Sequence, residues 1–321
     1  MFKRTLLILP LALAPACVEN VTTPTPRDLA PLSSAAPVSK STAESILSLM
    51  DDVNAKAKAR GDAFRVWKAE YVTLDGSAEA GAELLARTLG NKRLAADFVA
   101  FDPRRAAWSG SGPSSSDDIT FAVDETGDAT PPLGGTSGTA ANAAIRRAMT
   151  TWRGIGCAPG IGLTERSSGG QDLGYIAFLN IRRKVASDFI AADVMHSGWR
   201  DIDFAGGVLG VTFTLIFIDD AGNPTDIDGD GRNDVAFRDI YYDPSWNWRN
   251  GANIDIESVA LHEAGHGLSQ AHFGNLFVRN DGFFDPSPRA VMNAFYSAPL
   301  TTLLGTDEAG HCGNWQSWPN K

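Results

Sequence analysis

One stretch decides the fold of this chain: Ser258-Val-Ala-Leu-His262-Glu263-Ala-Gly-His266-Gly-Leu-Ser269-Gln-Ala-His272. It begins as a helix, in which residues four apart lie on one face about 6 Å from each other, so His262 and His266 can direct their imidazoles at one point. Such a pair is a two-sided clamp for a metal ion. Glu263 lies one residue along and can hold a water bound to that metal, which is the position of a general base.

His272 tests where this helix ends. In a continuous helix it would lie roughly 15 Å beyond His262 and off the metal-facing side. We therefore expect the helix to end soon after His266, with Gly267 and Ser269 as candidate stop residues. A turn at that point brings His272 back as a third nitrogen ligand, and three neutral imidazoles plus a water make an open catalytic zinc site.

The stretch resembles the metzincin metallopeptidase signature H-E-x-x-H-x-x-G-x-x-H, and Ile254-Asp-Ile-Glu-Ser-Val-Ala-Leu resembles the lead-in of its matrixin-type members. The family's glycine falls on Ser269, which would be strained by about 1 kcal/mol in a left-handed conformation. The family's methionine turn beneath the metal is matched by Val291-Met292-Asn293. The resemblance implies an α+β fold: a metzincin-like zincin domain with a twisted mixed β-sheet, an active-site helix and a Met-turn, preceded by a small α/β region.

The resemblance also implies a substrate pocket. Tyr296 falls where matrixins have the tyrosine of a Pro-x-Tyr wall, beside the residue that follows the scissile bond. Ala294 replaces the family's proline, so the depth of this pocket is open.

The composition limits the classes of partner. The chain has 321 residues, 43% of them apolar, which is enough for a full core, and a net charge of −10. This charge argues against nucleic acid. We expect a monomer that acts on a protein or peptide substrate and touches a membrane only through an N-terminal lipid.

The N-terminus has the pattern of an export signal. Met1-Phe-Lys3-Arg4 is positive, Thr5 to Leu13 is apolar, and Ala14-Pro-Ala16 is a small-residue cleavage site, so residues 1–16 are interpreted as a signal peptide. Cys17 follows that site, and the segment resembles a bacterial lipoprotein signal in which this cysteine is lipidated. The prediction is an exported protein, either a cell-envelope lipoprotein or, after simple cleavage, an extracellular one.

The remainder divides into three parts. Residues 17–42 are rich in Pro, Thr, Ser and Ala and are expected to form a flexible tether. Residues 43–108 are interpreted as a propeptide-like or accessory region, and residues 109–321 as the catalytic domain. Because residues 43–108 contain no cysteine to block a metal, an aspartate would have to do so; the candidates are Asp75, Asp97 and Asp102.

Periodicity predicts most of the ordered elements. Helices are expected at 43–60 and 140–153, with a strand at 64–74 and short elements within 78–89 and 94–100. Later strands are expected at 118–124, 161–165, 173–179 and 208–218.

The acidic loop Asp226-Ile-Asp228-Gly-Asp230-Gly-Arg-Asn-Asp234 precedes the histidine helix. Its alternate carboxylates around glycines can converge on a calcium ion, although the final glutamate of an EF-hand is missing. The alternative is an acidic, solvated hairpin.

The cysteines agree with export. If Cys17 carries a lipid, Cys157 and Cys312 are the only pair left, and an oxidising compartment permits a disulfide between them. The alternative is two buried free thiols.

These patterns favour an exported zinc endopeptidase in which Glu263 takes a proton from the attacking water and passes it to the leaving amine. One alternative is a catalytically inactive, metal-stabilised surface binding protein, favoured if Ser269 prevents His272 from closing the site. The other is a non-peptidase hydrolase, but the chain has no G-x-S-x-G elbow for a serine mechanism.

Overall fold

A computed structural model describes residues 41–77, 79–89, 95–109, 118–180, 187–202, 204 and 206–320 of the chain. The signal peptide, Cys17 and nearly all of the expected tether lie outside these residues. Within them, no helix combines the length and apolarity needed to cross a membrane.

The helices, in chain order, are α1 (Thr42–Arg60), α2 (Ala106–Ser109), α3 (Gly138–Arg153), α4 (Tyr175–Leu179), α5 (Ile256–Gly267) and α6 (Gly305–Trp315). Three of the helices begin at a residue whose side chain caps them: Ser41 for α1, Ser137 for α3 and Asp255 for α5. The Ser41 hydroxyl accepts the Glu44 amide at the start of α1, and Gly61 ends it in the left-handed conformation, with φ 79°. The helices expected at 43–60 and 140–153 are thereby confirmed.

The strands form one large mixed sheet and two short pairs. They are β1 (Phe64–Leu74), β2 (Ala82–Leu85), β3 (Ala96–Asp97), β4 (Thr120–Val123), β5 (Thr164–Glu165), β6 (Val194–His196), β7 (Val208–Phe217), β8 (Asn233–Tyr242), β9 (Trp248–Arg249), β10 (Ile254–Asp255), β11 (Asn275–Val278), β12 (Phe284–Ser287) and β13 (Phe295–Tyr296). The large sheet runs β13-β1-β7-β8-β6-β4-β5, with β2 added to β1 and β3 to β8. β7 is antiparallel to both of its neighbours, whereas β4, β5, β6 and β8 run parallel.

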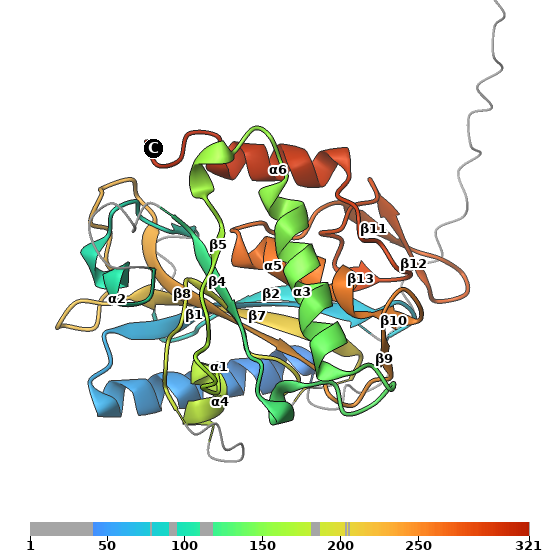
Figure 1. Cartoon of the computed structure of the whole chain (residues 1–321), viewed down its shortest axis with the longest axis horizontal. Helices are drawn as coiled ribbons and strands as arrows, with labels where there is room; N and C mark the ends of the chain where they lie inside the picture. The colour runs from blue at the N-terminus through green and yellow to red at the C-terminus, as the bar shows by residue number, and fades with distance from the viewer. Residues whose placement is uncertain are drawn as a thin grey trace, which may run out of the picture. The chain divides into compact units, whose positions relative to one another are not determined.

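Helices cover both faces of this sheet, which makes the fold α+β. Figure 1 shows α3, α5 and α6 on one side and α1 and α4 on the other. Two apolar clusters follow from this arrangement. One joins the sheet to α3 and α5 through residues such as Trp152 and Leu261, and the other joins it to α1 through Met50 and Val53.

One expected strand is a helix in the structure, and one long strand was not expected. Residues 173–179 were expected to be a strand, but they contain the helix α4, because a short apolar run buried on all sides suits either structure. The strand β8 was not expected, because Arg238 and Asp239 interrupt its apolar pattern. Both side chains are buried and satisfied: Arg238 donates to Thr214 and Gly267, and Asp239 accepts from Ser197 and Tyr241.

The expected boundary near residue 109 does not separate two compact units. Residues 40–321 form one unit, and β1 lies inside the large sheet between β7 and β13. The strand is continuous with the core because Val66, Ala69 and Tyr71 pack in the same cluster as α1.

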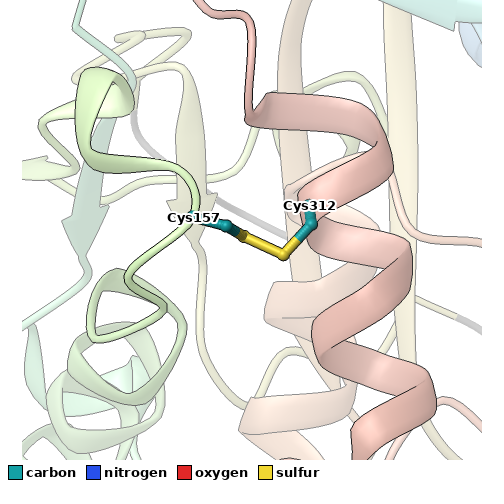
Figure 2. Close-up of a disulfide and its surroundings, with 2 residues drawn as sticks. All are labelled: Cys157 and Cys312. Carbon is teal, nitrogen blue, oxygen red and sulfur yellow. A yellow bond between two sulfur atoms is a disulfide. The ribbon is translucent and has the colours of Figure 1, made fainter.

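A disulfide ties the loop after α3 to α6. Cys157 and Cys312 are bonded, their Cα atoms are 5.7 Å apart, and 155 residues separate them in the chain (Figure 2). A bridge that closes so long a loop constrains the unfolded chain strongly.

Replacement of both cysteines by serine should therefore lower the free energy of unfolding by about 2–5 kcal/mol. Urea unfolding of the oxidised wild type and of the double variant, compared at matched pH, measures this difference. Equal midpoints would show that the bridge does not stabilise the fold.

Candidate metal centre

The helix α5 presents its histidines from a buried position. Asp255 caps its start by accepting the Ser258 amide at 2.9 Å, and every residue of the helix except Glu257 is buried. At Gly265 an added Cβ would lie 2.3 Å from the sulfur of Met292. Only glycine at this position lets the methionine pack directly against the helix between the two histidines.

The chain turns sharply where the sequence predicted it would. α5 ends at Gly267, and Ser269 takes a left-handed conformation with φ 65°, so the expected strain at this position is present. The turn is held by other bonds: Arg238 donates to the Ser269 hydroxyl at 3.0 Å, and the Asn314 amide donates to the Ser269 carbonyl at 2.9 Å. These contacts offset the strain and return His272 to the face of α5.

The three histidines converge on one point. The Nε2 atoms of His262 and His266 are 3.0 Å apart, and each lies 3.2 Å from Nε2 of His272. Two nitrogens bound at about 2.05 Å to one tetrahedral ion lie about 3.3 Å apart, so this spacing suits a shared ion.

The opposite ring nitrogens face backbone carbonyls. His262 Nδ1 lies 2.7 Å from the Val291 oxygen, and His266 Nδ1 lies 2.8 Å from the Gln270 oxygen. A carbonyl oxygen only accepts hydrogen bonds, so each Nδ1 must carry a proton, which in a neutral ring is the only ring N–H. The two Nε2 lone pairs then point at each other, an arrangement that is repulsive without a cation.

The electrostatics of the triad are consistent with that need. Burial lowers the pKa of His262 to about 3, which keeps its ring neutral. Burial also opposes charge on His266, but the Glu70 carboxylate, 3.4 Å from its Nδ1, outweighs this effect and raises the pKa. A negative group at this distance also stabilises a metal cation on the ring.

Glu263 lies beside the triad, and only one of its two carboxylate oxygens accepts a hydrogen bond from the described part of the chain. The Thr212 hydroxyl donates to Oε2 at 2.6 Å, whereas Oε1 has no hydrogen-bond partner among the residues that the structure describes. The side chain is fully buried, and burial raises its pKa to about 7. A carboxylate with that pKa can both accept and return a proton near neutral pH.

The Met-turn is held by a residue that the sequence did not single out for this role. The Asp307 carboxylate, on α6, accepts the amides of Val291, Met292 and Leu304 at 2.9–3.1 Å. Because Val291 also supplies the carbonyl for His262, Asp307 orients a histidine through the turn. A capping aspartate in a terminal helix has no sequence signature that links it to a histidine about 45 residues earlier.

A pocket lined by both apolar and polar side chains, Arg289 and Asn293 among the polar ones, lies next to the triad. Its lining includes Val72, Val259, His262, Val291, Tyr296 and Leu300. The structure places Tyr296 in the wall, where its hydroxyl accepts the Asp255 amide and donates to the Asn253 carbonyl. These bonds anchor the pocket to the start of α5.

The three aspartates considered as metal blockers have other partners. Asp75 accepts the Phe284 amide, Asp97 pairs with Arg232, and Asp102 accepts from Arg104. The carboxylates that contact the histidine segment belong instead to Glu70 and Glu83, the latter accepting the His272 amide at 3.1 Å.

The acidic loop before β8 forms only part of the expected calcium site. Oxygens of Asp226, Asp228 and Asp234 lie within 4.8 Å of one another, but Asp230 is not in this group. Arg104 donates to Asp234 at 2.8 Å and so compensates part of the negative charge. Calcium binding stays a prediction for this loop.

Asp307→Ala should lower the free energy of unfolding by at least about 3 kcal/mol, because three buried amides lose their acceptor. Asp307→Asn keeps one acceptor oxygen and should cost less. Urea unfolding measures both, with the exposed neighbour variant Glu308→Ala as the control. A loss no larger than that of the control would remove Asp307 from its supporting role.

Calcium should raise the thermal midpoint of the wild type, with a stabilisation of about 2.7 kcal/mol at a hundredfold excess over the dissociation constant. Asp228→Ala should abolish most of this gain, whereas Asp220→Ala, an exposed aspartate outside the cluster, should keep it. The measurement is a series of melts with zinc saturating and calcium varied. A midpoint that does not move would make the loop an acidic turn.

Comparison of the chain with models of known families and with curated proteins gave no match. The function of the site must therefore be inferred from its own geometry and chemistry.

Proposed function

We propose that this protein is a zinc-dependent endopeptidase of the metzincin type. The observation that carries the proposal is the convergence of three Nε2 atoms within 3.2 Å of one another, two of them on rings whose Nδ1 faces a carbonyl. A buried carboxylate with an oxygen that lacks a partner, on Glu263, lies on the same helix. Nitrogen donors in this number and spacing fit zinc better than the oxygen-seeking ions.

The residues divide the chemistry among themselves. His262, His266 and His272 would hold the ion. Bound zinc would polarise the carbonyl of a peptide bond and lower the pKa of a water molecule in the site. Glu263 would take the proton of the attacking water and deliver it to the leaving nitrogen, while Thr212 keeps the carboxylate in place.

The order of elements supports the metzincin assignment. β4 is followed by α3, then by the strands β5 to β8, and then by α5 with its histidines. A methionine lies under the histidines, and a tyrosine lies in the wall of the adjacent pocket. The same proposal includes export, with Cys17 as the lipid attachment site.

A second candidate is an inactive, metal-stabilised surface binding protein. The observation that favours it is the burial of the site: His266 and Glu263 have no exposed surface, and His262 is only 3% exposed. A substrate cannot reach these groups unless part of the chain moves.

Glu263→Ala tests the catalytic proposal. The variant should bind zinc as tightly as the wild type, since no ligand is lost, while chelator-sensitive hydrolysis of a denatured protein mixture falls by about 10²–10⁴-fold. Mass spectrometry of the digest measures the hydrolysis. Undiminished cleavage by the variant would exclude Glu263 as the base.

His272→Ala serves as the ligand variant. It should lower zinc affinity, whereas His311→Ala, which removes a buried histidine outside the triad, should not. Full zinc occupancy of His272→Ala at limiting metal would contradict the third-ligand assignment.

A further inference from the structure

The second half of β1 runs through the groove beside the triad. It is antiparallel to β7 on one side and parallel to β13 on the other, where Thr73 and Leu74 pair with Phe295 and Tyr296. The Leu74 amide donates to the Gly207 carbonyl, and the Asp75 amide donates to the Tyr296 carbonyl, both at 2.8 Å. A segment added in this way satisfies its backbone as a bound peptide would.

Val72 fills the pocket next to the metal centre. Its side chain is 2% exposed and lines the same pocket as His262, Val291 and Tyr296. In the ladder it pairs with Gly210, where an added Cβ would lie 2.8 Å from Oε1 of Glu263. The missing side chain at Gly210 leaves room for the carboxylate against the strands.

The backbone around Val72 also approaches Glu263. Gly210, the ladder partner of Val72, lies against Oε1 of Glu263, which has no hydrogen-bond partner among the described residues. Two residues earlier, the Glu70 carboxylate lies beside His266 and accepts from Lys68 at 2.7 Å. The peptide bond between Tyr71 and Val72 therefore lies at the catalytic groups.

We infer that residues 70–74 are a resident pseudosubstrate, which occupies the groove antiparallel to β7 and parallel to β13 and keeps the enzyme latent. The inference rests on the proposed function. It identifies the substrate class as extended peptides that add a strand between β7 and β13. The residue after the scissile bond is a branched aliphatic of about the size of valine.

For a substrate to enter, residues 70–75 must leave the groove while the first half of the strand stays in place. Its first half is fixed by Asn54 of α1, which bonds both the amide and the carbonyl of Val66 at 2.8 and 2.9 Å. The second half lies between two irregularities in the ladder with β7, one after Val66 and one after Val72. Such irregularities locally disrupt pairing, but Tyr71 packs in the cluster that contains α1, so release of residues 70–75 also costs the packing of this side chain.

The test measures peptide binding in a background that cannot cleave, Glu263→Ala. The probe is a fluorescein-labelled peptide with the sequence of residues 68–75, and the host proteins are the full chain with and without Val72→Arg. An arginine is larger than the valine it replaces and would add a positive charge to a pocket whose lining already includes Arg289, so this variant should free the groove. Fluorescence anisotropy should show at least tenfold tighter binding of the probe to the Val72→Arg host.

The control probe is the same peptide with arginine in place of its valine, and it should bind neither host. Equal binding of the first probe to both hosts, or binding that is insensitive to its valine, would overturn the inference. If Val72→Arg does not fold, Val72→Ala removes two methyl groups without adding charge and gives the same readout with a smaller ratio.

The two proposals fail separately. If probe binding depends on Val72 but the protein neither holds zinc nor hydrolyses peptides, the inference about residues 70–74 is supported and the peptidase proposal is rejected. If the chain with Glu263 intact hydrolyses peptides in a zinc-dependent way and Val72→Arg does not change the rate, the peptidase proposal is supported and the inference about residues 70–74 is rejected.

Discussion

The Nε2 atoms of three histidines lie within 3.2 Å of one another, so their lone pairs face the same point. Contacts elsewhere in the structure hold the three rings in this arrangement. Backbone carbonyls fix the tautomers, the turn at Ser269 returns the third ring, and the methionine beneath α5 prevents the helix from shifting. Without a positive charge at their centre these groups repel each other. Contacts farther away offset this repulsion, including the Asp307 carboxylate, which accepts the amides of Val291 and Met292 in the Met-turn.

Much of the site could be predicted from local sequence because its spacing is helical. The face shared by His262 and His266 follows from the period of 3.6 residues, and the end of the helix follows from the need to place His272. The left-handed conformation of Ser269 was also foreseeable, because the position requires a turn. What the sequence does not show is compensation: nothing in the order of residues links Ser269 to Arg238 or Asn314.

The fold was predictable where one face of an element is apolar and the other is polar. Those conditions hold for α1 and α3, whose bounds were expected to within a few residues, whereas β1 was expected from its alternating, aromatic sequence although nearly all of it is buried. They fail for β8, where a buried arginine and aspartate carry charge into the core, and for α4, which is apolar all round. The place of β1 in the large sheet depends on pairing over more than 130 residues of chain, and local patterns carry no information about such pairing.

The disulfide between the loop after α3 and α6 has a consequence for when the protein matures. The helix α6 carries Asp307, and so a covalent bond restrains the element that supports the Met-turn and, through it, His262. Thiols stay reduced in a cytosol and pair in an oxidising compartment. Under the proposed export, the histidines would be held least firmly while the two thiols are reduced and most firmly once the disulfide has formed in an oxidising compartment.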